Sequence, residues 1–357
     1  LEGGAMHLRR SARIMAAGVL AVGLAISTAS PAAAVEIDQV ADGFAGPLGL
    51  AIGADGTVYV AQVFLGTLTA IDRDGDRTDL VTGEPVAGGV EPLGRDQVVY
   101  TTRVGEEGAP PSEASLMRVS PAGMTRQLAS LLAYEAAENP DATNLYGLVD
   151  LDPACAAEVE ALLGGQVTYP GQVDSNPYAV AFDRGGYVVA DAGGNDIVRV
   201  DANGRVSTVA VLPPIDTTLG PEVVEEFGAP ECVVGATYRA EPVPTDVEVG
   251  PDGSYYVSSL PGFPEAPGTG SVFRVTRSGS VDLVATGFSG AVDLAVTDDG
   301  TIYVAELFGG QISQIVHGDA SVLVEVTEPA AVEVAPDGVL YATTDAFGNG
   351  RVVIVTP

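Results

Sequence analysis

Apolar and polar residues alternate along short runs that recur through the chain. Each copy is an alternating run, an Asp-Gly or Gly-Gly pair, and a second run rich in β-branched and aromatic residues, which is the pattern of a β-hairpin. A second pair of short runs follows each copy. Four antiparallel strands in each of six repeats predict an all-β fold, a six-bladed β-propeller. The copies are residues 47–61 (PLGLAIGADGTVYVA), 244–258, 291–305 and 329–343, a looser copy at 177–191 and the weakest at 88–102.

The two ends of the repeat region predict how the ring closes. The last repeat has only three strands, the third at residues 351–356. Residues 35–46 (VEIDQVADGFAG) are similar to residues 280–290 (SVDLVATGFSG), which form the fourth strand of an earlier repeat. We therefore expect an N-terminal strand to complete the last blade, which would remove an exposed strand edge.

Long connections interrupt the repeats on one face only. In a propeller, the loops between the second and third strands and those between blades lie on the same face. The long ones here are residues 131–176 and 213–243, with shorter extensions at 103–115 and 260–270. Asp152-Pro153 and Gly164-Gly165 bound a helical run in the first insertion, and residues 221–227 predict a short helix in the second. We expect the two insertions to form a lid over one face.

The first 34 residues have the pattern of an export signal. Arg9, Arg10 and Arg13 precede an apolar stretch at 14–26, and residues 30–34 (SPAAA) offer a cleavage site after Ala34. A retained N-terminal anchor is the alternative, although the stretch is shorter than the roughly 20 residues of a membrane span. We expect a secreted, extracellular protein whose mature part, residues 35–357, is one propeller with no membrane span.

Composition narrows the class of partner and suggests a disulfide. The formal net charge of −32 disfavours nucleic acid and anionic membranes, which need basic patches. Cys155 and Cys232 lie one in each insertion, and an even count in an exported chain favours a disulfide between them. Two unpaired buried thiols are the alternative. We expect a monomer whose partner is a small molecule or an extracellular protein.

Acidic residues at the blade mouths are the candidate site. The ends of the second strands place Gln62, Asp191, Glu306 and Asp345 near the channel, with Asn195 just beyond, and we take these five as ligand-binding candidates. Starts of first strands bring Asp246 and Asp293 to the same rim. Carboxylates from several blades suit Ca²⁺, which takes about 6–8 oxygen ligands. Solvated carboxylates or turn caps are the alternative reading. The metal candidates are Asp191, Asp246, Asp293, Glu306 and Asp345.

The sequence lacks the residues that other kinds of catalytic or cofactor site need. His7 lies in the signal and His317 in a turn on the opposite face, so no histidine pair is available for acid–base or metal work. The Cys and His clusters of zinc sites are absent. No nucleophile elbow, phosphate-binding loop or dinucleotide fingerprint occurs.

Several segments resemble the ScyD/ScyE family of exported propellers. The resemblance rests on residues 188–195 (VVADAGGN), 241–253 (EPVPTDVEVGPDG), 303–311 (YVAELFGGQ) and 341–350 (YATTDAFGNG), and it covers nearly the whole mature chain. It implies the fold and export, and it transfers no catalytic residue. More distantly, the chain is similar to NHL-type, gluconolactonase-like and streptogramin-lyase-like propellers, although the lyases use histidines that the mature chain lacks.

Two functional hypotheses follow. The first is an extracellular binding protein, because a rigid ring carries a decorated face without a recognisable catalytic set. The second is a Ca²⁺-dependent hydrolase or lactonase at the acidic channel mouth, where a carboxylate-held metal would polarise a carbonyl and activate water.

Overall fold

The alternating runs form short antiparallel strands in the computed structural model, which describes residues 35–94, 97–105 and 110–356. Residues 1–34, expected to hold a few upstream residues and the signal peptide, lie outside the described residues. No helix in the described part of the chain is long and apolar enough to cross a membrane.

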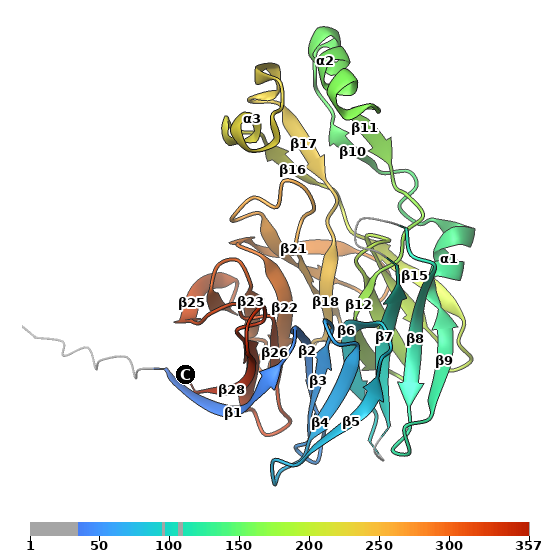
Figure 1. Ribbon diagram of the computed structural model, residues 1–357, viewed down its shortest axis with the longest axis vertical. Helices are drawn as coiled ribbons and strands as arrows, with labels where there is room; N and C mark the ends of the chain where they lie inside the picture. Colours follow the sequence, from blue (N-terminus) through green and yellow to red (C-terminus); the bar gives the residue numbers. More distant parts are fainter. Residues whose placement is uncertain (1–34, 95–96, 106–109, 357) are drawn as a thin grey trace, which may run out of the picture. The chain divides into compact units, whose positions relative to one another are not determined.

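Six four-stranded sheets are each built from strands that follow one another in the sequence, apart from β1 (Figure 1). The bounds are β2 Pro47–Ile52, β3 Val58–Gln62, β4 Thr67–Ile71 and β5 Arg77–Thr82; β6 Val86–Pro92, β7 Val98–Val104, β8 Glu113–Val119 and β9 Thr125–Ser130; β12 Pro177–Asp183, β13 Gly186–Asp191, β14 Asp196–Val200 and β15 Val206–Val211; β18 Pro244–Val249, β19 Tyr255–Ser259, β20 Gly270–Val275 and β21 Val281–Phe288; β22 Ala291–Val296, β23 Ile302–Glu306, β24 Gln311–Val316 and β25 Asp319–Glu325; β26 Ala331–Val334, β27 Leu340–Thr344, β28 Gly350–Thr356 and β1 Glu36–Phe44.

The sheets stand in a closed ring. The first strand of each sheet contacts the first strand of the next, in the order β2, β6, β12, β18, β22, β26 and back to β2. Each sheet buries both faces against its neighbours: Leu50 and Val60 of the first sheet pack with Ala331 and Val352 of the last. The second strand of the first sheet, β3, is therefore buried throughout, whereas its outermost strand, β5, is largely exposed. This is the architecture of a β-propeller.

The N-terminal strand closes the ring, which confirms the prediction from the sequence. Strand β1 pairs antiparallel with β28, with Ile37 opposite Val355 and Gln39 opposite Val353. Phe44, at the end of β1, is only 2% exposed, and the guanidinium of Arg77 lies 4.6 Å from the centre of its ring.

The two insertions form a seventh sheet that the sequence analysis did not predict. Its order is β11-β10-β17-β16, so the middle pair joins the two insertions, with Gly147 opposite Arg239. These short strands pair across a long sequence separation, and local patterning carries no signal for such pairing. With α2 and α3 we call this sheet the insertion module. Its elements and the nearby helix α1 are β10 Leu145–Leu148, β11 Thr168–Pro170, β16 Ile215–Thr218, β17 Thr237–Ala240, α1 Leu131–Glu138, α2 Pro153–Leu163, α3 Glu222–Phe227 and the 3₁₀ helix Glu231–Val233.

A disulfide joins the insertions, as predicted. Cys155 on α2 is bonded to Cys232, and Cys155 packs in a small core with Leu148, Val159 and Val223. The two predicted helices are also present, and Asp152 caps the first by accepting hydrogen bonds from the backbone N–H groups of Ala154 and Cys155. Helix α1 was not predicted from the sequence.

Candidate functional site

Asp191, the predicted rim residue of the third sheet, accepts hydrogen bonds from the two loops beside it. Its carboxylate accepts hydrogen bonds from the Ser175 hydroxyl at 2.5 Å and from the Asn176 N–H at 2.6 Å. The N–H groups of Gly193 and Gly194 also donate to it, each at 3.2 Å. The side chain thus ties the loop that enters β12 to the turn that leaves β13.

The equivalent residues of the first and fifth sheets do the same. Gln62 accepts from the N–H of Ala45, which precedes β2, at 3.1 Å. Glu306 accepts from the N–H of Ser289, which precedes β22, at 2.7 Å, and from the Gln311 side chain at 2.8 Å. This repeated capping agrees with the turn-cap alternative for these positions, and their role in ligand binding stays a prediction.

The other two rim candidates also have local partners. Asp345 forms an ion pair with Arg351 of its own sheet. Asn195 donates to Asp141 of the first insertion at 3.0 Å and accepts from the N–H of Val243, at the end of the second insertion, at 3.2 Å. Asn195 therefore holds both insertions against the third sheet.

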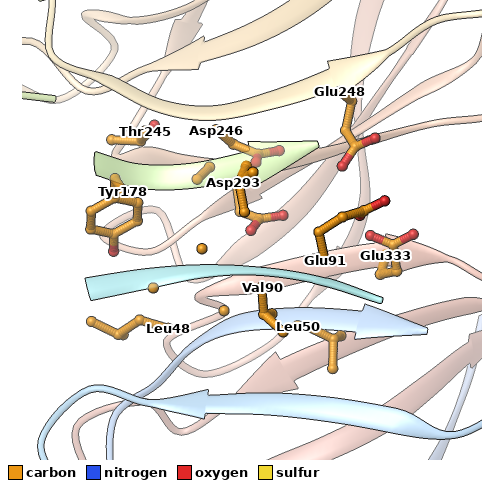
Figure 2. A pocket seen from close by; sticks show the side chains of 15 residues that line it. Leu48, Leu50, Val90, Glu91, Tyr178, Thr245, Asp246, Glu248, Asp293 and Glu333 are labelled. Carbon is orange, nitrogen blue, oxygen red and sulfur yellow. The ribbon is translucent and has the colours of Figure 1, made fainter. Parts of the chain in front are cut away.

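Asp246 and Asp293 are the predicted metal candidates that the structure brings together. Both line the central channel, where each carboxylate reaches the first strand of the next sheet (Figure 2). Asp246 accepts from the N–H of Leu294 and Asp293 accepts from the N–H of Val332, each at 3.0 Å. These bonds link three consecutive blades at the channel wall.

Three glutamates that the sequence analysis missed line the same channel. Glu91, Glu248 and Glu333 occupy one register position, opposite Val99, Tyr256 and Tyr341 of the adjoining strands. They come from the second, fourth and sixth sheets, so a glutamate occupies this position in every second blade. The equivalent positions of the other three sheets are Ala51, Ala181 and Ala295.

Part of this pattern was visible in the sequence. Glu248 and Glu333 fall in one column when their repeats are aligned. Glu91 falls in that column only when the second repeat is shifted by one residue, because Val99 and not Tyr100 matches the tyrosines of the other second strands. Pairing between strands establishes that shift, and the sequence pattern does not.

The channel carboxyls resist ionisation. Burial raises the pKa of Glu91 to about 7 and that of Asp246 to about 7. Burial, and then the charge of Glu333, raise the pKa of Glu248 well above its ordinary value. Like charges so close together disfavour simultaneous ionisation, so the channel holds protons at neutral pH.

The channel cavity is too small for an organic substrate. The centre of a water molecule can occupy a volume of about 20 Å³ in it. One water needs roughly 10–15 Å³ by the same measure. Within the described residues, no group of three or more Asp, Glu, His or Cys is arranged to hold a metal ion. As placed, the predicted Ca²⁺ ligands do not fit that ion, because they are dispersed among blades and accept hydrogen bonds locally.

A larger cleft of about 410 Å³ opens in the insertion module. An aromatic cluster forms part of its wall: the ring of Phe263, from a loop of the fourth sheet, lies edge-on 4.8 Å from Phe227 and 5.1 Å from Tyr238. Leu162 and Leu163 of α2 are 57% and 64% exposed beside it. The remaining wall is apolar: Leu148, Val159, Leu219, Val223, Ala229, Pro230 and Val233.

Comparison with solved structures supports the propeller architecture. A putative glucose dehydrogenase from Thermus thermophilus is similar with a TM-score of 0.56 at 17% identity, over 90% of this chain and 100% of that one. The fold is that of a β-propeller. A putative gluconolactonase gives 0.55 at 13% identity, over 91% and 93%. A streptogramin B lyase gives 0.51 at 13% identity, over 90% and 97%.

At these identities the likeness concerns the fold alone, since propellers carry many unrelated activities. No protein-family model matches the sequence, and no curated protein does.

Proposed function

We propose that this protein is an exported propeller of the ScyD/ScyE type that binds an apolar small molecule in the cleft of the insertion module. The observation that carries the proposal is the cleft itself, with its volume of about 410 Å³ and its nearly continuous apolar wall. Small-molecule sites are typically clefts of about 300–1,000 Å³ lined by hydrophobic and aromatic side chains.

The way the cleft is built supports binding. Its walls come from both insertions and from Phe263 of the fourth sheet, and the Cys155–Cys232 disulfide fastens the two insertions together. A preformed site loses less entropy when a ligand binds. Exposed apolar side chains grouped at a cleft are also more typical of a binding site than of plain surface. The Tyr238 side chain, which has an apolar ring and a polar hydroxyl, is also part of the wall.

The alternative, a Ca²⁺-dependent hydrolase or lactonase at the channel mouth, has less support. Of its five metal candidates, Asp246 and Asp293 share a cavity, and that cavity has room for water but not for a substrate. We therefore derive no catalytic step through a metal.

A neutral apolar dye tests the proposal, since the net charge of −32 would repel anionic probes. Titration of the purified protein with Nile red should give saturable fluorescence at one site per chain. Leu163→Asp places a charge at an exposed position of the cleft and should weaken binding at least tenfold, about 1.4 kcal/mol. Leu283→Asp, at a 59% exposed leucine on β21, is the matched control and should bind like the wild type.

Two results would reject this function. The first is dye binding that does not saturate or that Leu163→Asp leaves unchanged. The second is a dimer in gel filtration that Leu163→Asp converts to monomer, because the apolar wall would then serve a second copy of the chain.

A further inference from the structure

Two arginines line a cavity between the second and third sheets. Arg118 of β8 lies opposite Arg126 of β9 in the strand pairing, so the two side chains share one face of the second sheet. Among the residues that the structure describes, neither forms an ion pair with a carboxylate. Like charges directly opposite each other on neighbouring strands are destabilising. In a chain with a net charge of −32, an arginine pair without an acid calls for an explanation.

The cavity has a volume of about 430 Å³ and is lined by turns as well as strands. Leu128 of β9 and Tyr187 of β13 contribute apolar surface beside the arginines. The rest of the wall comes from the turns between β12 and β13 and between β14 and β15: Gly185, Asp201, Ala202, Asn203 and Gly204. Small-molecule sites typically measure about 300–1,000 Å³, so the cavity has room for an organic molecule.

The junction between the third and fourth sheets shows a carboxylate in a similar setting. Asp183, at the end of β12, accepts hydrogen bonds from Arg199 at 3.1 Å and from Arg277 at 2.8 Å. It also accepts from the Tyr255 hydroxyl at 2.9 Å, and it is only 5% exposed. Two guanidinium groups and one tyrosine hydroxyl therefore hold a buried carboxylate between these two blades.

The junction between the second and third sheets repeats this framework without the carboxylate. Strand pairing identifies the residues that occupy the same positions in the two junctions. The equivalent pairs are Arg118 and Arg199, Tyr187 and Tyr255, and Leu93 and Asp183. A leucine that packs against the core between the sheets thus stands where the other junction has its acid. The arginine and the tyrosine are kept, and Arg126 adds a second guanidinium.

The wall of the cavity is positive on balance. Burial raises the pKa of Tyr187, and the charge of Arg118 opposes that shift, so the guanidinium lies close enough to act on the hydroxyl. Asp201 is the acid of the wall, and its Oδ1 accepts from the backbone N–H groups of Asn203 at 2.8 Å and Arg205 at 3.0 Å. Two arginines against one aspartate leave a net positive charge in a protein that is acidic as a whole.

We propose that this cavity binds a small organic anion whose carboxylate or phosphate group lies between Arg118 and Arg126. Guanidinium groups bind such oxyanions through paired N–H donors. The Tyr187 hydroxyl is placed to donate a further hydrogen bond, as Tyr255 does to Asp183. The Tyr187 ring and Leu128 offer contact to the body of the molecule. The cavity shares no lining residue with the apolar cleft or the central channel.

Calorimetric titration with phenyl phosphate and with benzoate tests the site. At pH 7.5 and about 0.15 M NaCl the Debye length is about 8 Å, so the diffuse negative charge of the protein is screened more than direct contacts are. We expect saturable binding of at least one of the two probes at one site per chain, and the tighter probe identifies the anionic group. Benzyl alcohol, which carries the ring without a charge, should not bind measurably.

Three variants locate the anion. Arg118→Gln and Arg126→Gln should each weaken binding at least about tenfold, because each removes charge-assisted hydrogen bonds. Arg126 is exposed and Arg118 half-buried, so both variants should fold, and unchanged far-ultraviolet circular dichroism would verify this. Arg73→Gln is the matched control, since it removes an exposed arginine from the turn between β4 and β5 of the first sheet and should leave binding unchanged.

Failure of both anionic probes to bind would overturn the proposal, and so would binding that Arg118→Gln and Arg126→Gln leave unchanged. Equal weakening by Arg73→Gln would show diffuse attraction to positive charge, and equal binding of benzyl alcohol would show recognition of the ring alone; either result rejects the site. Leu163→Asp, which tests the apolar cleft, should not affect the anionic probes. Nile red binding does not depend on the arginines, so the two proposals fail separately.

Discussion

Loss of the disulfide should loosen the insertion module and leave the ring intact. In the double variant Cys155→Ser and Cys232→Ser, the two insertions stay joined by the pairing of β10 with β17, by hydrogen bonds from Thr237 to the Asp150 carboxylate and by a small apolar core. The six sheets have their own cores and their own closing strand, and they make no use of the bond.

The stability that the module loses with the disulfide follows from the length of the loop that the bond closes. Its cysteines are 77 residues apart, and chain entropy for such a loop is about 4.5 kcal/mol. The third sheet lies within that loop and stays folded when only the module opens. The flexible part is then 20 residues from Cys155 to Ser175 plus 20 from Leu212 to Cys232, or 40. A loop of that length still gives about 4 kcal/mol.

Native-state hydrogen exchange measures this difference directly. A loss of about 4 kcal/mol should speed exchange in the module by roughly a thousandfold. The N–H of Leu148, bonded to the Val167 carbonyl at 2.9 Å, reports on the module. The N–H groups of Val60 and Val189 report on the blades and should exchange as before. Equal acceleration in module and blades, or less than about tenfold in the module, would refute the reasoning.

Two further changes test the ring. Asp183→Asn should lower the free energy of unfolding by about 3–5 kcal/mol at pH 7, because Asp183 accepts from Arg277 at 2.8 Å and from the Tyr255 hydroxyl at 2.9 Å across two blades. Burial raises the pKa of Asp183, but the hydrogen bonds from Arg277 and Tyr255 outweigh it and lower the pKa below 3.8. The ionised side chain therefore contributes its full share of the free energy of unfolding above that pH. This contribution is lost as the pH falls through the lowered pKa, so the free energies of urea unfolding of wild type and variant should converge in acid. A difference that stays constant with pH would contradict this. Phe44→Ala removes a ring that anchors the closing strand beside Arg77 and should cost about 3–5 kcal/mol by the same assay; a loss below about 1 kcal/mol would mean that β1 is dispensable.

The candidate site was only partly predictable from the sequence. The repeats located Asp191 and Glu306 at the strand ends, but not the backbone N–H groups that these carboxylates accept from. The three channel glutamates stand in one layer because strand pairing sets their register.

The sequence by itself determined the blades, the closing strand, helices α2 and α3 and the pairing of the two cysteines. The strands and helices depend on local alternation, turn residues, caps or repeat similarity, which a short stretch of chain carries within itself. The cysteine pairing followed from the count of two cysteines, one in each insertion. Only the tertiary structure decided the seventh sheet, the apolar cleft and the layer of three glutamates in the central channel. Those features arise where segments far apart in the chain meet, and their energies depend on burial and distance, which no local pattern records.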